Sequence, residues 1–247
     1  MIYLFLLALL CYTLIQFIES ISFGSRVAGK LTNRLALGTT IQHSIVAISR
    51  LFLLPLLLSL SFMIESGLSI QLFLMMAFFL TIAAFFTSLM VLINFNYFQL
   101  LFQHLFIRYQ VSTIPVSIVK VFFGKKIEFN EIDLKITPKI RDLSLKKIIA
   151  SSFAYYFIST AFLISFSLAI LIPEYRMTMS QLTTAFQGIG VMILTMYIDP
   201  MISRSLDVEL DNSHWIDNIY SIFVGRVLAY LLASATFFIF YLYTYLT

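Results

Sequence analysis

Six long apolar runs dominate this sequence and restrict the folds open to it. They lie at about residues 2–22, 35–63, 70–95, 148–172, 182–198 and 219–246. A helix of roughly 20 apolar residues crosses the hydrocarbon layer of a bilayer, so each run is long enough for one span. With 60% hydrophobic and 11% charged residues, the chain lacks the charges of a soluble surface. Because the runs do not alternate as barrel strands do, we predict an all-α polytopic membrane protein, one integral-membrane domain over residues 1–247.

The rest of the composition excludes several other classes of protein. A net charge of +4 gives no reason to expect nucleic acid as a partner. The single cysteine, Cys11, has no intrachain partner for a disulfide and cannot form a cysteine metal site. HExxH, GxSxG and Walker-type phosphate loops are missing from the sequence, so we expect a protein that is not an enzyme and uses no cofactor.

The distribution of basic residues predicts an orientation in the membrane. Three of them, Arg26, Lys30 and Arg34, follow the first run, and nine more lie in the long middle segment 96–147. The loop between the second and third runs has none. Cytoplasmic loops are enriched in lysine and arginine, so we expect residues 96–147 to be cytoplasmic and both termini to lie outside. The first run has no basic segment ahead of it and no signal-peptide cleavage site, so we expect it to be retained as a span.

The middle segment is the longest stretch without a span. Residues 97–109 and 111–123 mix aromatic and aliphatic side chains with polar and basic ones, as amphipathic helices at a membrane interface do. Residues 124–147 are more hydrophilic. At roughly 50 residues the segment is too small for a catalytic domain with its own core. We expect interfacial helices that contact anionic headgroups.

Arg50 is the clearest charge inside a predicted span. It lies about 15 residues into the second run, roughly 22 Å along a helix, and Pro55 follows it as an expected kink. An arginine at mid-span costs about 2.5–3.5 kcal/mol on insertion scales, so it should face protein, water or a ligand. His43, on the same span, is interpreted as a helix contact that lines a groove.

A second intramembrane arginine, Arg226, lies near the start of the sixth run. A stripe of small residues begins beside it, at Gly225, Ala229 and Ala233. Such stripes usually mark close helix packing, which would turn Arg226 toward neighbouring helices. The alternative is that Arg226 extends to the headgroups at the membrane surface. The same stripe favours a homodimer.

Two carboxylates lie in or near spans and need partners. Glu19 is one or two turns inside the first span, and Arg26, Arg50 or Arg226 are its candidate partners. Asp199 follows the fifth span. Each is interpreted either as a member of a structural ion pair or as a titratable group that couples ion movement to transport.

The fifth span is short and polar for its length. It contains Gln187, Gly188 and Gly190, and it ends at Asp199-Pro200, where we expect a loop over 199–217. Glycine-interrupted helices form transporter sites, because freed backbone groups need a cavity or protein around them. The alternative is a closely packed interior helix. Gln187, Gly188 and Gly190 are therefore candidate groove-lining residues.

Three runs give the sequence a resemblance to a known family. They are FIESISFGSRVAGKLTNRLALGTTIQHSIVAISR (17–50), MYIDPMISRSLD (196–207) and VGRVLAYLLAS (224–234). In order and spacing they resemble the alternate lipid II flippases, the Amj family. The resemblance implies translocation of lipid-linked peptidoglycan precursor from the inner to the outer leaflet of a bacterial plasma membrane. The family's recognisable positions would be occupied by Arg26, Gly29, Arg50, Asp199 and Arg226.

The resemblance and the arginines lead to one functional hypothesis. Arginine's planar fork suits bidentate recognition of phosphate, so we expect Arg26, Arg50 and Arg226 to bind the pyrophosphate of lipid II. Lys30 and Arg34 would gather substrate from among the membrane lipids. Two alternatives stay open: a secondary transporter of a small organic anion, and a non-transporting membrane scaffold with structural arginines.

Overall fold

The computed structural model describes residues 1–109, 116–117, 143–208 and 212–246, and every regular element within these ranges is a helix. The first half holds α1 (Ile2–Leu31), α2 (Leu35–Ser49), η1 (Arg50–Phe52), α3 (Leu53–Glu65), α4 (Ile70–Ile93) and α5 (Phe95–Tyr109). The second half holds α7 (Leu145–Leu171), η3 (Pro173–Tyr175), α8 (Arg176–Ile193), η4 (Leu194–Ile198), α9 (Asp199–Val208) and α10 (Asn212–Leu246). The prediction of an all-α fold is confirmed.

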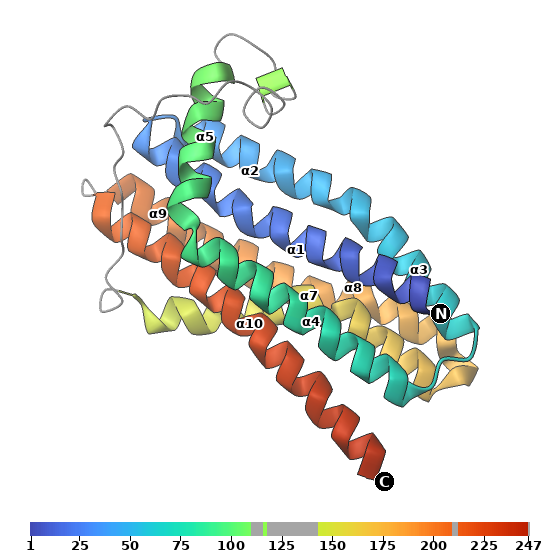
Figure 1. Ribbon diagram of the computed structural model, residues 1–247. Coiled ribbons are helices and arrows are strands. Elements are labelled where there is room, and N and C mark those ends of the chain that lie inside the picture. The colour runs from blue at the N-terminus through green and yellow to red at the C-terminus, as the bar shows by residue number, and fades with distance from the viewer. Residues whose placement is uncertain (110–115, 118–142, 209–211, 247) are drawn as a thin grey trace.

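Six helical segments among the described residues are long and apolar enough to cross a membrane. They are Ile2–Leu31, Leu35–Glu65, Ile70–Ile93, Leu145–Leu171, Pro173–Arg204 and Trp215–Leu246. The protein is therefore a multi-pass membrane protein, as the apolar runs predict. Figure 1 shows the spans running alongside one another, with the N- and C-termini toward the same end of the bundle.

The first helix continues past its predicted end at residue 22, so Arg26 and Lys30 lie on α1 rather than in a loop. Close packing of α1 on α2 explains the extension. Ser25 Oγ donates to the carbonyl oxygen of Gly38 at 3.0 Å. A Cβ added at Gly29 would lie 2.9 Å from Gly38 Cα, so the two backbones touch there. Hydropathy predicts only where the apolar run ends, whereas this contact with α2 stabilises the helix beyond that point.

The fifth span also differs from its prediction. No break occurs at Gly188 or Gly190, since α8 runs through both, and α9 forms where a loop was expected. The irregular turn lies later, at η4, which has π-helical hydrogen bonding. Pro200 has no N–H to give to the preceding turn, and the wider η4 just ahead of it lets the chain stay helical.

The middle segment is described only at its ends. Residues 97–109 form most of α5, so the first predicted amphipathic helix is present, and it rises at an angle to the spans (Figure 1). Its buried Phe102 and Phe106 pack with Ala28 and Ile41 from α1 and α2. The second predicted helix, 111–123, lies outside the described residues apart from 116–117.

Helix pairing divides the bundle into two sides. On one side α2, α3, α4 and α5 pack against α1; on the other α8 and α10 pack against α7, and α10 joins the sides through α4. Neither α2 nor α3 has extensive contact with α8 within the described residues. The span formed by α2 and α3 is thus separated from α8 along the bundle.

The small-residue stripe on α10 packs inside the chain. Ser152 Oγ on α7 donates to the Gly225 carbonyl at 2.9 Å, and a Cβ added at Gly225 would lie 1.9 Å from Ser151 Oγ. Ala229 and Ala233 are fully buried. Close packing at the stripe is therefore confirmed, and its Gly225 end is covered by α7. The homodimer stays a prediction.

Candidate functional site

A groove that contains several charged side chains lies between α2–η1–α3 and α8–η4–α9. It consists of three adjoining cavities: the Gln187 cavity, about 240 Å³, the central cavity, about 140 Å³, and the Trp215 cavity, about 210 Å³. Glu19 and Arg50 line both the Gln187 and the central cavity. Arg26 and Asp199 line both the central and the Trp215 cavity. The three cavities are therefore neighbours that share lining residues along the bundle.

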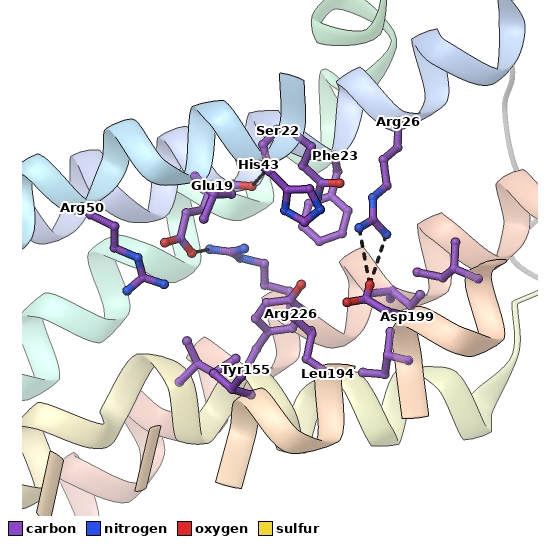
Figure 2. Close-up of a pocket in the computed structure, with 17 residues that line it drawn as sticks. Glu19, Ser22, Phe23, Arg26, His43, Arg50, Tyr155, Leu194, Asp199 and Arg226 are labelled. Carbon is purple, nitrogen blue, oxygen red and sulfur yellow. Dashed lines mark hydrogen bonds and ion pairs between the residues drawn. The ribbon is translucent and has the colours of Figure 1, made fainter. Parts of the chain in front are cut away.

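Three arginines from three elements line the central cavity, as the sequence hypothesis expects. Arg26 comes from α1, Arg50 from η1 and Arg226 from α10, and Figure 2 shows all three side chains extending into the cavity. Their surroundings differ, however. Two are paired with carboxylates, while the third has no carboxylate partner in the described part of the chain.

Arg226 is held by an extensive buried network. Its Nη2 donates to Glu19 Oε2 and to Gln16 Oε1, each at 2.9 Å, and its Nε donates to Tyr230 Oη at 2.8 Å. The guanidinium also lies 4.8 Å from the centre of the Tyr155 ring, within range of a cation–π contact. Only 2% of Arg226 is exposed, so the headgroup interpretation is wrong. Most of its hydrogen-bonding capacity is used inside the protein.

Glu19 connects three helices through its two oxygens. Oε2 accepts from Arg226 on α10, and Oε1 accepts from Ser49 Oγ on α2 at 3.2 Å. Among the three candidate partners that the sequence offered, the ion-pair partner of Glu19 is therefore Arg226. Whether this carboxylate also titrates during transport stays a prediction.

A second ion pair lies where the central and Trp215 cavities meet. Arg26 Nη1 and Nη2 lie 3.3 and 3.4 Å from Asp199 Oδ1 (Figure 2). This contact joins α1 to the first residue of α9. The two side chains are 13% and 35% exposed, so the pair borders the groove rather than lying in the core.

Arg50 is the arginine whose charge is left available. Its side chain is exposed, lines the central and Gln187 cavities, and makes no hydrogen bond or ion pair with the rest of the described protein. It begins η1, a 3-10 turn just ahead of the predicted kink at Pro55. A guanidinium without a counter-ion, in a groove between membrane spans, is suited to an anionic ligand.

Only some of the predicted groove-lining residues line the cavities. His43 lines the central and Trp215 cavities, and Gln187 lines the cavity named after it. Gly190 instead packs on α7, where a Cβ would lie 2.5 Å from the Ala154 carbonyl oxygen. Gly188 has open space around it and lines none of the three cavities. The close-packing interpretation therefore fits Gly190 alone.

Lys30 and Arg34 lie beyond the three cavities. Both are partly exposed, at the end of α1 and just before α2. Arg34 Nη1 donates to the Phe106 carbonyl oxygen on α5 at 2.9 Å. These two residues do not join the arginines of the central cavity.

Gln42 and Trp215 also line the groove, although neither was predicted from the sequence to do so. Gln42 lies about two helical turns before Arg50, so helical periodicity was the available signal for it. Trp215 gave no such signal, because it belongs to a stretch predicted to be a loop. Over the described ranges, no cluster of three His, Cys, Asp or Glu side chains is placed to hold a metal ion.

Comparison with known proteins places the chain in a family. The family model Amj, described as Alternate to MurJ, matches residues 11–240, which include four of the six spans completely, most of the first and last spans, and the groove. No curated protein and no solved structure matches the chain. The match extends over nearly the whole sequence, and the chain belongs to the Amj family.

Proposed function

We propose that this protein is a lipid II flippase, which moves undecaprenyl-pyrophosphate-linked peptidoglycan precursor from the inner to the outer leaflet of the bacterial plasma membrane. Membership of a family named as the alternate to MurJ supports this proposal. The observation that carries it is Arg50, a guanidinium in a groove between spans that no carboxylate of the described ranges pairs with. A pyrophosphate is the dianionic group that such a side chain recognises well.

The separation of α2 and α3 from α8 supports a lipid as the substrate. A groove bordered by two outer helices without extensive mutual contact lets an acyl or prenyl chain stay in the bilayer while the headgroup enters. A transporter of a small organic anion would need no such lateral opening. Closed midplane cavities serve small solutes better.

The other basic residues receive different roles in this proposal. Arg26 is a second phosphate ligand that becomes available when its ion pair with Asp199 opens. Arg226 supports the cavity wall, because its donors are engaged by Glu19, Gln16 and Tyr230. Lys30 and Arg34 gather lipid II from among the membrane lipids at the cytoplasmic surface.

The orientation and energy source complete the proposal. Both termini lie outside, and residues 96–147 lie in the cytoplasm beside the leaflet in which lipid II is made. Because the sequence has no nucleotide-binding loop, transport is coupled to an ion, to the membrane potential or to consumption of the flipped lipid. Glu19 and Asp199 are the candidate coupling groups.

Complementation tests the proposal directly. In a bacterium whose own lipid II flippase is depleted, the wild-type chain should restore growth and the amount of lipid II at the outer surface. Arg50→Ala should insert and accumulate as the wild type does but restore neither. Failure of an inserted wild-type chain to expose lipid II would contradict the flippase function. Normal exposure with Arg50→Ala would contradict the role of Arg50.

A further inference from the structure

Buried polar atoms without partners gather along one part of the groove. Gln42 Oε1, Arg26 Nε and Trp215 Nε1 are buried and have no hydrogen-bond partner among the residues that the structure describes, and their residues line the central and Trp215 cavities. Trp215 is 1% exposed and Gln42 is 8% exposed. About 90% or more of buried polar groups in proteins are paired, so this grouping marks a place for a hydrogen-bonding ligand.

The unpartnered atoms are of both kinds. The indole N–H of Trp215 and the Nε–H of Arg26 are donors, whereas Gln42 Oε1 is an acceptor. Asp199 adds a carboxylate at the junction of the two cavities. While Arg26 stays paired with Asp199, a phosphate, which needs donors only, would be repelled by these acceptor oxygens. A hydroxyl group suits the mixture because it both donates and accepts.

We propose that the Trp215 cavity, together with the Gln42 side of the central cavity, is the sugar subsite of the headgroup site. Its space of about 210 Å³ far exceeds the roughly 10–15 Å³ that one water needs. Sugar hydroxyls and an N-acetyl amide pair with Trp215 and Gln42. This inference rests on the proposed function, in which the pyrophosphate binds at Arg50.

Gln42 and Arg50 lie on the same span, in an order that fits a headgroup whose sugar is adjacent to its pyrophosphate. Gln42 precedes Arg50 by about 12 Å along the helix axis. His43, beside Gln42, lines both cavities of the subsite. The pyrophosphate at Arg50 and the sugar linked to it therefore lie next to one another in the groove.

Two lipid probes separate the sugar subsite from the phosphate site. The first is undecaprenyl pyrophosphate, and the second is the same lipid carrying one N-acetylated hexose and no peptide. Binding of each is measured to the full-length protein in lipid nanodiscs. Trp215→Phe removes the indole N–H, and Gln42→Leu removes the amide. Each variant should weaken binding of the sugar-bearing lipid roughly 3- to 10-fold, the effect of one lost hydrogen bond, and leave undecaprenyl pyrophosphate unchanged.

Gln99→Leu is the matched control. Gln99 is also a buried glutamine with an unpartnered Oε1, but it lies on α5 and lines none of the three cavities. It should not change the ratio of the two affinities. A ratio that is also unchanged in both Trp215→Phe and Gln42→Leu overturns the sugar subsite, even if both variants are less stable. Arg50→Ala should weaken binding of both lipids equally, and no effect on either would contradict the role of Arg50 in the proposed function instead.

Discussion

Arg226 and Glu19 form an ion pair of 2.9 Å whose side chains are only 3% and 10% exposed. The pair joins α10 to α1 beside the central cavity. Breaking a buried pair leaves one charge without compensation, which costs far more than the intact pair contributes. The same two side chains therefore hold α10 against α1 and form part of the wall of the groove.

The first prediction concerns the stability of this pair. Arg226→Met leaves Glu19 buried and uncompensated, so it should lower the free energy of unfolding by about 3–5 kcal/mol. Thermal unfolding of the purified protein in detergent measures the effect. The double variant Glu19→Gln with Arg226→Met should recover much of the loss. A single variant as stable as the wild type would show that the pair is not structural.

The second prediction separates charge from shape at Arg50. Arg50→Lys keeps the positive charge but loses the planar fork that binds phosphate through two hydrogen bonds. We expect flipping of lipid II in proteoliposomes to fall about tenfold or more, with the unfolding temperature unchanged because the side chain is exposed. Arg204→Ala is the control, since Arg204 is an exposed arginine outside the three cavities. Full activity in Arg50→Lys would indicate simple charge pairing.

The third prediction concerns the pair of Arg26 and Asp199. Since both side chains are partly exposed, Asp199→Asn should change stability by less than about 1 kcal/mol. If Arg26 serves as a second phosphate ligand, the same variant should alter the rate of flipping several-fold. Rates in proteoliposomes and unfolding temperatures, compared on one preparation, test this. A loss of stability without a change in rate would assign the pair to the scaffold alone.

Sequence patterns predicted the fold better than they predicted the site. Hydropathy identified all six spans, because crossing a membrane needs a long apolar run whatever the run contacts. The C-terminal end of α1 and the existence of α9 were missed, since a backbone contact such as Gly29–Gly38 depends on which helices meet. Hydropathy carries no information on that choice.

The arginines too were predictable from the sequence only in part. The cost of a charge at mid-span predicted that Arg50 faces protein, water or a ligand, and the small-residue stripe favoured an inward Arg226. Arg26 was predicted only as a phosphate ligand next to the first span, and all three arginines line one cavity. Which of them keeps its charge available could not be predicted. It depends on where α10 places Arg226 relative to Glu19, and helices far apart in the sequence give no signal of that in a single chain.

The fourth prediction uses two glycines on one helix. Gly190→Ala would place a Cβ 2.5 Å from the Ala154 carbonyl oxygen, so α8 must move from α7, at a cost of about 1–3 kcal/mol. Gly188→Ala meets no atom within 4 Å and should stabilise α8 by up to about 1 kcal/mol. Unfolding temperatures of the two variants should therefore shift in opposite directions. Equal shifts would contradict this packing of α8 on α7.

The fifth prediction tests the orientation. Cys11 is the single native cysteine and is buried, so Cys11→Ala gives a background without thiols. In that background a membrane-impermeant maleimide should label Ser66→Cys in intact cells. Lys146→Cys should be labelled only after the membrane is opened. Both positions are exposed in the structure. The reverse pattern would place the termini in the cytoplasm.

The groove shortens the distance over which a polar headgroup would have to cross hydrocarbon, whereas a prenyl chain stays in the full hydrocarbon layer. Along α1, the cavity-lining residues extend from Arg26 to Tyr12, about 21 Å of helix, against a hydrocarbon layer of about 30 Å. A headgroup that follows this path exchanges water for protein donors over most of the thickness. A headgroup on this path would cross only about 9 Å of hydrocarbon outside the groove, so most of its route would lie beside side chains of α1, α2 and α8.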